Sequence, residues 1–159
     1  MSLVTENPDT VTELTHLLSE VPEVGLHMRE LAQLNELLGG YSTSLGLRFT
    51  TVERDKVCAE MPISHDHLQA MGLVNGGVYC AIAETVGSVM GLIKAPGKLV
   101  AGVNNNTDFL APVRTGVLSA EASIIHAGVS TQLIHVDIFH RSTLVARSTL
   151  RTMVLKPHD

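Results

Sequence analysis

The sequence predicts an α+β fold in which a curved antiparallel sheet wraps around one long central helix. Residues 76–93 are apolar around nearly their whole circumference at helical spacing, which is typical of a helix buried on every side. Two segments before this helix and four after it alternate polar and apolar residues, as strands do. Short turns join these segments, so neighbouring strands should pair antiparallel. One face of such a sheet needs an apolar cover, and residues 76–93 are the only segment apolar enough to provide it.

The first 43 residues predict a helical extension, 1–43, ahead of a domain that spans residues 44–159. Thr10 and Glu13 form a capping-box pattern at the start of a first helix, which Pro22 ends. A second amphipathic helix follows and is expected to stop at the pair Gly39-Gly40. The leucines that share one face of this second helix are Leu31, Leu34, Leu37 and Leu38. Nothing in the first helix suggests chemistry, so we interpret it as an accessory.

Six strands are expected in the domain. Two precede the long helix, at residues 45–52 and 56–62, and a connection at residues 63–75 leads into it. A short run with Pro96 and Gly97 ends the helix. The four strands after the helix are expected at residues 99–110, 117–126, 132–140 and 143–155.

The composition favours a folded chain with an aliphatic core. Of the 159 residues, 45% are hydrophobic and 17% charged, while aromatic residues make up 3% and tryptophan is absent. The formal net charge of -5, with no basic run, argues against a nucleic-acid partner. No apolar run reaches, without polar interruption, the roughly 18 residues that suggest a membrane span.

Location and redox state follow from two further observations. The first seven residues lack the basic end and the apolar centre of a signal peptide. Cys58 and Cys80 lack a metal-like spacing and are expected to be reduced thiols. We therefore expect a cytoplasmic protein with no membrane partner.

Glu84, in the middle of the apolar segment, is the first candidate for chemistry. A buried carboxylate is unfavourable unless something pairs with it or uses it. It is therefore either a catalytic group, as a nucleophile or as a general base for water, or a structural acid paired with a polar neighbour. Ser88 lies one helical turn later on the same face, where it either lines a site or allows close helix packing.

The start of the same segment offers hydrogen-bond donors. Gly76 and Gly77 lie where the helix begins, and free N–H groups there, together with the helix dipole, suit an oxygen that becomes negative. An ordinary tight turn is the simpler interpretation of the two glycines. Asn75 is a good N-cap residue, and its amide is also able to donate to a ligand.

The histidines do not form a recognisable site. His65 and His67 are spaced as zinc ligands sometimes are, but no second ligand cluster follows at a useful spacing. We therefore interpret both as surface-loop residues and expect no metal. His126, His135 and His140 form no triad, and the sequence has no nucleophile elbow.

One set of residues is similar to a family motif that runs Asn/Gln-x-x-Gly-x-x-His-Gly-Gly with an acidic residue nine positions after the histidine. The positions that carry it here are Gln69, Gly72, Asn75, Gly76, Gly77 and Glu84. The runs 83–89 and 102–116 extend the match, which covers roughly residues 44–155. On these residues the chain resembles the hotdog-fold acyl-CoA thioesterases. The similar branch includes phenylacetate-pathway thioesterases, the Glu-dependent 4-hydroxybenzoyl-CoA thioesterases and the 1,4-dihydroxy-2-naphthoyl-CoA thioesterases.

Three positions depart from the family pattern. Asn75 stands where the family usually has histidine, and Phe109 stands where the naphthoyl-CoA branch often has histidine. Val129 follows Gly128 where the family often has arginine. The first departure removes a group that transfers protons, and the second changes the acyl pocket.

The resemblance implies roles for individual residues. Glu84 would be the nucleophile or general base, and the Gly76 N–H would hold the oxyanion. Gln69 would orient the water or the carboxylate, and Asn75 would donate to the thioester carbonyl. The residues that the resemblance places around the substrate are Gly77, Thr85, Ser88, Asn106, Asp108, Phe109 and Arg114, the last as a contact for coenzyme A phosphates.

The function that the resemblance implies is hydrolysis of an aromatic or medium-chain acyl-CoA to the free acid and coenzyme A. No cofactor is expected, because coenzyme A is part of the substrate. The resemblance also implies a homodimer that pairs again into a homotetramer as a dimer of dimers, with each site between two subunits. Two alternatives stay open: a non-catalytic acyl-CoA-binding protein, and a dehydratase or hydratase of the same fold.

Overall fold

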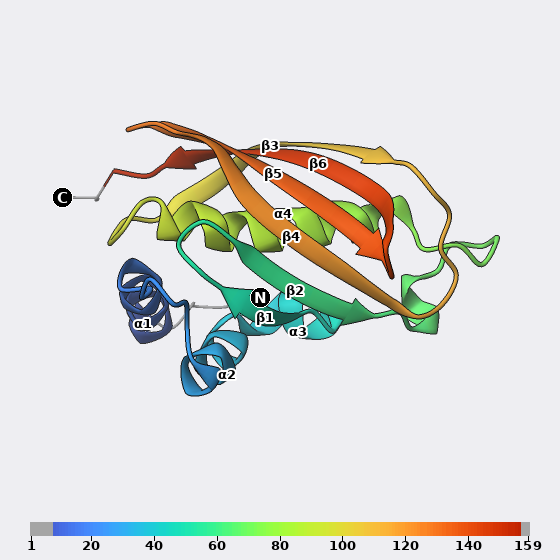
Figure 1. Cartoon of the computed structure of the whole chain (residues 1–159), viewed down its shortest axis with the longest axis horizontal. Helices are drawn as coiled ribbons and strands as arrows, with labels where there is room; N and C mark the ends of the chain where they lie inside the picture. The colour runs from blue at the N-terminus through green and yellow to red at the C-terminus, as the bar shows by residue number, and fades with distance from the viewer. Residues whose placement is uncertain (1–7, 157–159) are drawn as a thin grey trace, which may run out of the picture.

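The computed structural model describes residues 8–156, and its elements follow the predicted order of helices, two strands, a long helix and four strands (Figure 1). The helices before the sheet are α1 (Pro8–Ser19), α2 (Met28–Leu37) and α3 (Gly39–Leu45). The remaining elements are β1 (Arg48–Val52), β2 (Val57–Pro62), the short 3-10 helix η1 (His65–His67), α4 (Gly76–Ile93), β3 (Val100–Phe109), β4 (Val117–Ala127), β5 (Thr131–His140) and β6 (Thr143–Val154).

The strands form one six-stranded sheet in the order β1-β2-β4-β5-β6-β3, and every neighbouring pair is antiparallel. The sheet curves over α4, which packs against β2, β3, β4, β5 and β6 (Figure 1). This is the predicted architecture of a sheet wrapped around one helix. It leaves β1 and β3 as the two edges of the sheet.

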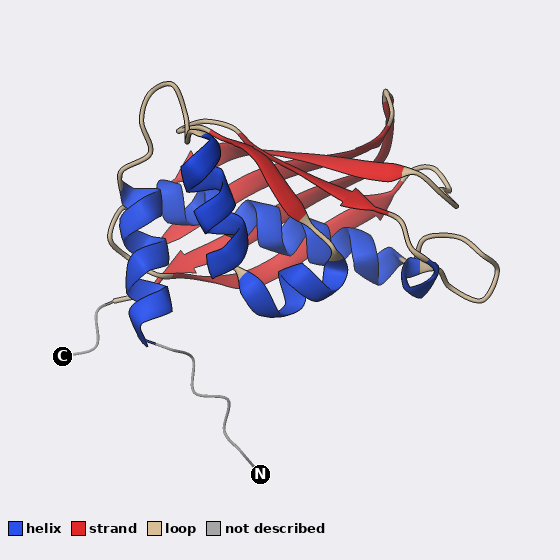
Figure 2. Cartoon of the chain, turned by 90° about the horizontal axis from the view of Figure 1, so that it is seen from below, coloured by secondary structure: helices blue, strands red, loops and turns tan. Residues whose placement is uncertain are grey.

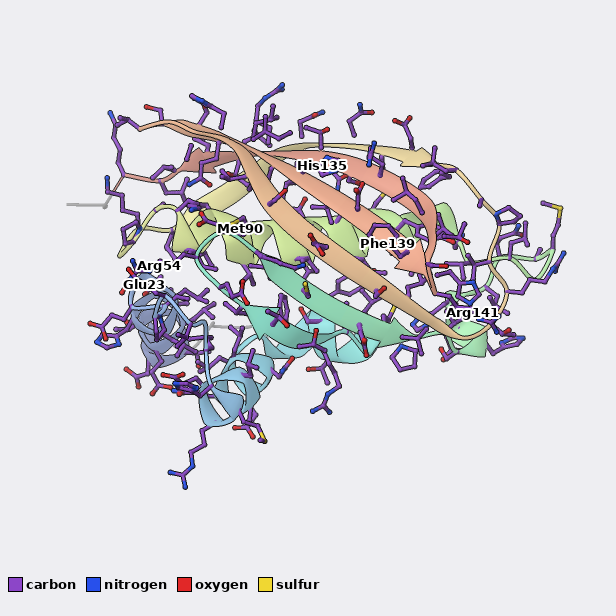
Figure 3. All side chains as sticks on the ribbon, viewed as in Figure 1. Glu23, Arg54, Met90, His135, Phe139 and Arg141 are labelled. Atoms are coloured by element: carbon purple, nitrogen blue, oxygen red, sulfur yellow. The ribbon has the colours of Figure 1, made fainter. Side chains whose placement is uncertain are left out.

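Alternation along the strands builds the core beneath the sheet. On β5, Ile134, Val136 and Ile138 are fully buried against the α4 side, where they meet residues such as Met90 of α4. His135 and Phe139 of the same strand lie on the opposite face (Figure 3). The aliphatic residues therefore form one apolar layer between α4 and the sheet.

The long helix differs from its prediction in one respect, because it is not buried on every side. Its residues that are not buried recur every three or four positions, singly or as adjacent pairs, and form a single stripe along the helix. This stripe consists of Gly76, Gly77, Cys80, Ala81, Glu84, Thr85, Ser88 and Leu92. Among the helices of residues 8–156, α4 alone has the length and hydropathy of a membrane span, and half of it is buried inside the fold. It is thus the core helix of the layer.

The N-terminal helices also differ from the prediction in detail. The first helix already includes Pro8, a favoured residue of a first helical turn, so Thr10 is not its N-cap. The second helix stops near the glycine pair as expected, but the chain turns at Gly40, whose φ is 49°, and continues as α3. The short α3 has no apolar periodicity of its own, which explains why the sequence did not indicate it.

These helices cover the β1 edge of the sheet. Asn35 of α2 pairs with both backbone groups of Phe49: its Nδ2 donates to the carbonyl at 3.1 Å, and its Oδ1 accepts the N–H at 2.8 Å. The Leu26 N–H donates to the Val52 carbonyl at 2.8 Å. Arg54, in the β1–β2 turn, donates to the Val21 carbonyl at 2.9 Å (Figure 3).

The opposite edge is uncovered. Within residues 8–156, β3 pairs with β6 alone, so the other side of this ten-residue strand has no backbone partner. Figure 2 shows the helices gathered on one face of the sheet, with the N-terminal helices beside one part of it. A sheet with one blocked edge and one open edge can gain a further strand only at β3.

Replacement of Asn35 with leucine should destabilise the protein by about 1–3 kcal/mol, because the Phe49 N–H and carbonyl lose their partners. Urea unfolding of N35L against wild type measures this change. Q33L, on the exposed side of the same helix, is the matched control and should leave the free energy of unfolding within about 0.5 kcal/mol of wild type. Equal stability of N35L and Q33L would contradict the edge-capping role.

Candidate active site

A cavity of about 330 Å³ opens beside the N-terminus of α4. Its lining is mainly apolar and comes from the loop before α4, the first turns of α4 and the end of β3. The lining residues are Gln69, Leu73, Val74, Gly76, Tyr79, Phe109, Leu110, Ala111 and Pro112. Three residues singled out in the sequence, Gln69, Gly76 and Phe109, therefore lie around one cavity.

Asn75 caps α4, as the sequence predicted. Its backbone is extended, its side-chain oxygen accepts the Gly77 N–H at 2.8 Å, and its carbonyl accepts the Val78 N–H at 3.0 Å. Among the described residues, the Gly76 N–H has no acceptor. Of the two glycine N–H groups, only that of Gly76 is therefore free to bind a ligand, and it lies at the positive end of the helix dipole.

The aromatic ring of Phe109 lies directly over Gly76. A Cβ atom at this position would lie 2.7 Å from Cζ of Phe109, so the ring occupies the space that any other residue would need. The Phe109 and Tyr79 ring centroids are 5.8 Å apart, and burial raises the pKa of the Tyr79 phenol, which keeps it neutral. Phe109 itself is 56% exposed, so its ring can move without breaking the core.

Glu84 is half-buried and lies on the exposed stripe of α4. The fully buried environment predicted for it is absent because the stripe faces away from the apolar layer. Its carboxylate rests against β3 at Gly102, where a methyl group would overlap it, next to a bulge in the strand. Within residues 8–156 the carboxylate has neither an ion pair nor a hydrogen bond, so none of these residues occupies it.

Neighbours of Glu84 on α4 divide into two kinds. Ser88 shares the exposed stripe, one turn further on. The Thr85 hydroxyl instead donates to the Ala81 carbonyl at 2.9 Å, within its own helix. Ser88 is thus presented alongside Glu84, and Thr85 is turned back to the backbone.

The loop before α4 is braced by side chains. The Gln69 side-chain oxygen accepts the Met71 N–H at 2.5 Å, and Gln69 itself borders the cavity. Arg114 donates to the carbonyls of Met71 and Gly72 at 3.0 and 3.3 Å. In this structure Arg114 therefore holds the loop, and its other donors stay available at an exposed position.

His67 differs from its prediction. It is 8% exposed rather than a surface residue, and its Nδ1 accepts the Ser64 N–H at 3.0 Å. Its carbonyl accepts the Asn75 N–H at 2.9 Å, which ties η1 to the cap of α4. His65 is exposed as expected, and residues 8–156 contain no cluster of potential metal ligands.

Strand β3 separates its predicted site residues onto two faces. Asn105 and Thr107 point toward α4, since Asn105 bonds to a carbonyl of that helix and Thr107 to Asn105. Alternation places Asn106 and Asp108 on the other face, so of the predicted strand residues only Phe109 borders the cavity.

The sequence did not indicate Asn105 or Tyr79 as residues of the site. A polar residue on the helix-facing side of β3 would indicate a role for Asn105. Which residues face the helix depends on the strand register, and the sequence leaves that register open.

Known proteins share this fold and this site region. The thioesterase superfamily model matches residues 71–146. The proofreading thioesterase EntH of Klebsiella pneumoniae is 33% identical over 96 residues, which are 60% of this chain and 70% of that protein. The 1,4-dihydroxy-2-naphthoyl-CoA hydrolase of Listeria monocytogenes is 31% identical over 62% of this chain and 81% of its own length.

A solved structure of a related protein has the same fold. A thioesterase from Haemophilus influenzae superposes with a TM-score of 0.74 at 36% identity, over 79% of this chain and 90% of that one. These similarities confirm the resemblance stated from the motif. The chain belongs to the thioesterase superfamily and has its hotdog fold.

Proposed function

We propose that this protein hydrolyses an acyl-CoA thioester to the free acid and coenzyme A, with Glu84 as nucleophile or general base. The observation that carries the proposal is that one helix, α4, presents both a carboxylate, at Glu84, and an N–H group, at Gly76, that have no partner among the described residues. As a general base, Glu84 takes a proton from a water that adds to the carbonyl carbon, and the C–S bond then breaks. As a nucleophile, Glu84 adds to the carbonyl carbon, the C–S bond breaks to leave a mixed anhydride, and water then hydrolyses this anhydride and restores the carboxylate. In both routes the thiolate of coenzyme A leaves and takes up a proton.

The cavity supports an aromatic or medium-chain acyl group. Its volume of about 330 Å³ and its apolar lining fit a group of that size and polarity. The Listeria relative is named for an aromatic acyl-CoA, which supports the same class of substrate. Phe109 and Tyr79 would contact the acyl group, Gln69 and Asn75 would lie near the carbonyl, and Arg114 would lie near the phosphates.

The reacting groups require two copies of the chain. Gly76 and Glu84 are eight residues apart on α4, which is about 12 Å along the helix axis. A carbonyl held at Gly76 is therefore out of reach of Glu84 in the same chain, because reacting atoms must lie about 3 Å apart.

A two-fold dimer resolves this separation. Pairing of the open β3 edges would place two α4 helices side by side and antiparallel, so that Glu84 of one copy faces Gly76 of the other. Val103 and Leu110, at and just beyond β3, are each more than half exposed, and association would cover this apolar surface. The proposed enzyme is thus a homodimer with a shared site.

The test of this function is release of coenzyme A from a panel of benzoyl, phenylacetyl, hexanoyl and acetyl thioesters. E84Q should lower kcat by about 10²–10⁴, the range that a positioned acid or base contributes. E60Q, at an exposed carboxylate on β2, is the matched control and should keep wild-type activity. Wild-type activity in E84Q would contradict the mechanism. Tight acyl-CoA binding without turnover by the wild-type protein would instead identify a binding protein.

A comparison of two substitutions at Gly76 separates the contribution of its N–H group from the effect of an added side chain. Proline is favoured at a first helical position, where its missing N–H breaks no bond, and Asn75 already has the extended backbone that a residue before proline needs. Alanine adds the same Cβ against Phe109 but keeps the N–H. G76P should therefore have a kcat about 10²-fold or more below that of G76A. Equal kcat values for the two variants would show that this N–H does not hold the oxyanion.

A further inference from the structure

Two side-chain amides from the sheet donate to backbone carbonyls of α4. Asn105 Nδ2, on β3, donates to the Cys80 carbonyl at 2.9 Å. Gln132 Nε2, on β5, donates to the Gly91 carbonyl at 3.0 Å. The two bonds meet the helix on either side of Glu84, one turn before it and about two turns after it.

Both amides are themselves held in place by hydroxyls. The Thr107 hydroxyl donates to the Asn105 side-chain oxygen at 2.7 Å and also contacts the hydroxyl of the buried Ser148. The Thr152 hydroxyl donates to the Gln132 side-chain oxygen at 2.8 Å. With its oxygen engaged, each amide has its N–H group turned toward the helix, so the two contacts are directional rather than incidental.

The carbonyl that Asn105 contacts belongs to the turn that carries Glu84. In an α-helix the N–H of residue 84 bonds to the carbonyl of residue 80, so Asn105 and the Glu84 N–H share the Cys80 oxygen. The same strand also receives the Glu84 carboxylate, at Gly102. Strand β3 therefore contacts this turn of α4 twice. The Asn105 side chain contacts the Cys80 carbonyl, and the Gly102 backbone contacts the Glu84 side chain.

Hydrogen bonds from the sheet add a directional constraint to the apolar packing of α4. Close packing at Gly87 and Gly91 seats the buried face of the helix, and a hydrogen bond inside the fold, which depends steeply on direction, further restricts its rotation. A modest rotation of the helix would carry the Glu84 carboxylate away from Gly102 and turn the exposed stripe relative to the sheet.

We propose that Asn105 is a positioning residue, which fixes the rotation of α4 at residues 80–84 and so directs the Glu84 carboxylate into the site. This role rests on the proposed function of Glu84. Gln132 has the same kind of bond at the far end of the helix and acts on stability alone.

The experiment compares N105V with Q132M. Each variant removes one amide-to-carbonyl bond, with an apolar side chain suited to its surroundings. N105V should lower kcat for acyl-CoA hydrolysis by about 10- to 100-fold with little change in KM, since displacement of a reacting group acts on the chemical step. Q132M should keep kcat within about twofold of wild type while it lowers the free energy of unfolding.

Hydrogen exchange supplies a readout that does not depend on activity. Exchange of the Glu84 amide should accelerate in N105V and not in Q132M, because only the first variant disturbs the shared carbonyl. N105D, which keeps the acceptor for Thr107 and lacks the donor, is the second variant and should behave as N105V in both measurements.

The outcomes separate the two proposals. Unchanged kcat and unchanged Glu84 exchange in both Asn105 variants would overturn the positioning role, as would an equal loss of kcat in N105V and Q132M. If wild-type protein hydrolyses none of the thioesters, or if E84Q keeps full activity, the proposed function fails. In that case accelerated Glu84 exchange in N105V would still establish the contact as the one that holds this turn of α4.

Discussion

The orientation of α4 is the constraint on which the rest of the structure depends. This helix contributes one side of the apolar core, and its N-terminus presents the free Gly76 N–H. Its exposed stripe carries Glu84. Apolar contacts hold α4 under the sheet, and directional bonds add a constraint on how it is turned. Those bonds come from Asn105 and Gln132 along its length, while Asn75 caps its start.

The two edges of the sheet differ in whether their backbone groups have partners. Asn35 and Leu26 use up the backbone groups that β1 would otherwise offer, while β3 keeps an open side next to the stripe of α4. An open edge is usually a liability for a monomer. Here the open edge of β3 lies beside the Glu84 carboxylate, which has no partner among the described residues. The N-terminal helices therefore favour association at the edge where a second copy would complete the proposed site.

Patterns that depend on local periodicity could be predicted from the sequence. The boundaries of α4, the six strands to within a few residues, and the cap at Asn75 all follow from composition and spacing. The family resemblance then indicated Gln69, Gly76 and Phe109, which the fold brings around one cavity.

Features that depend on tertiary placement could not be predicted in the same way. The burial of His67 results from its packing against the start of α4, and a loop sequence carries no period that would reveal this. The choice between Asn105 and Asn106 depends on strand register, which a bulge near Gly102 shifts. The exposed stripe was invisible because small residues such as Ala81 and Gly77 are compatible with burial and with exposure alike.

The central claim is that Glu84 of one copy and the Gly76 N–H of another act on the same thioester. The direct measurement is thioesterase activity of a heterodimer in which one chain carries E84Q and the other G76P, isolated by two different affinity tags. A shared site leaves one of the two sites with both native groups, so the heterodimer should recover roughly half of the wild-type activity per dimer. Activity no higher than the mean of the two mutant homodimers would contradict the account, since every site would then contain a defect.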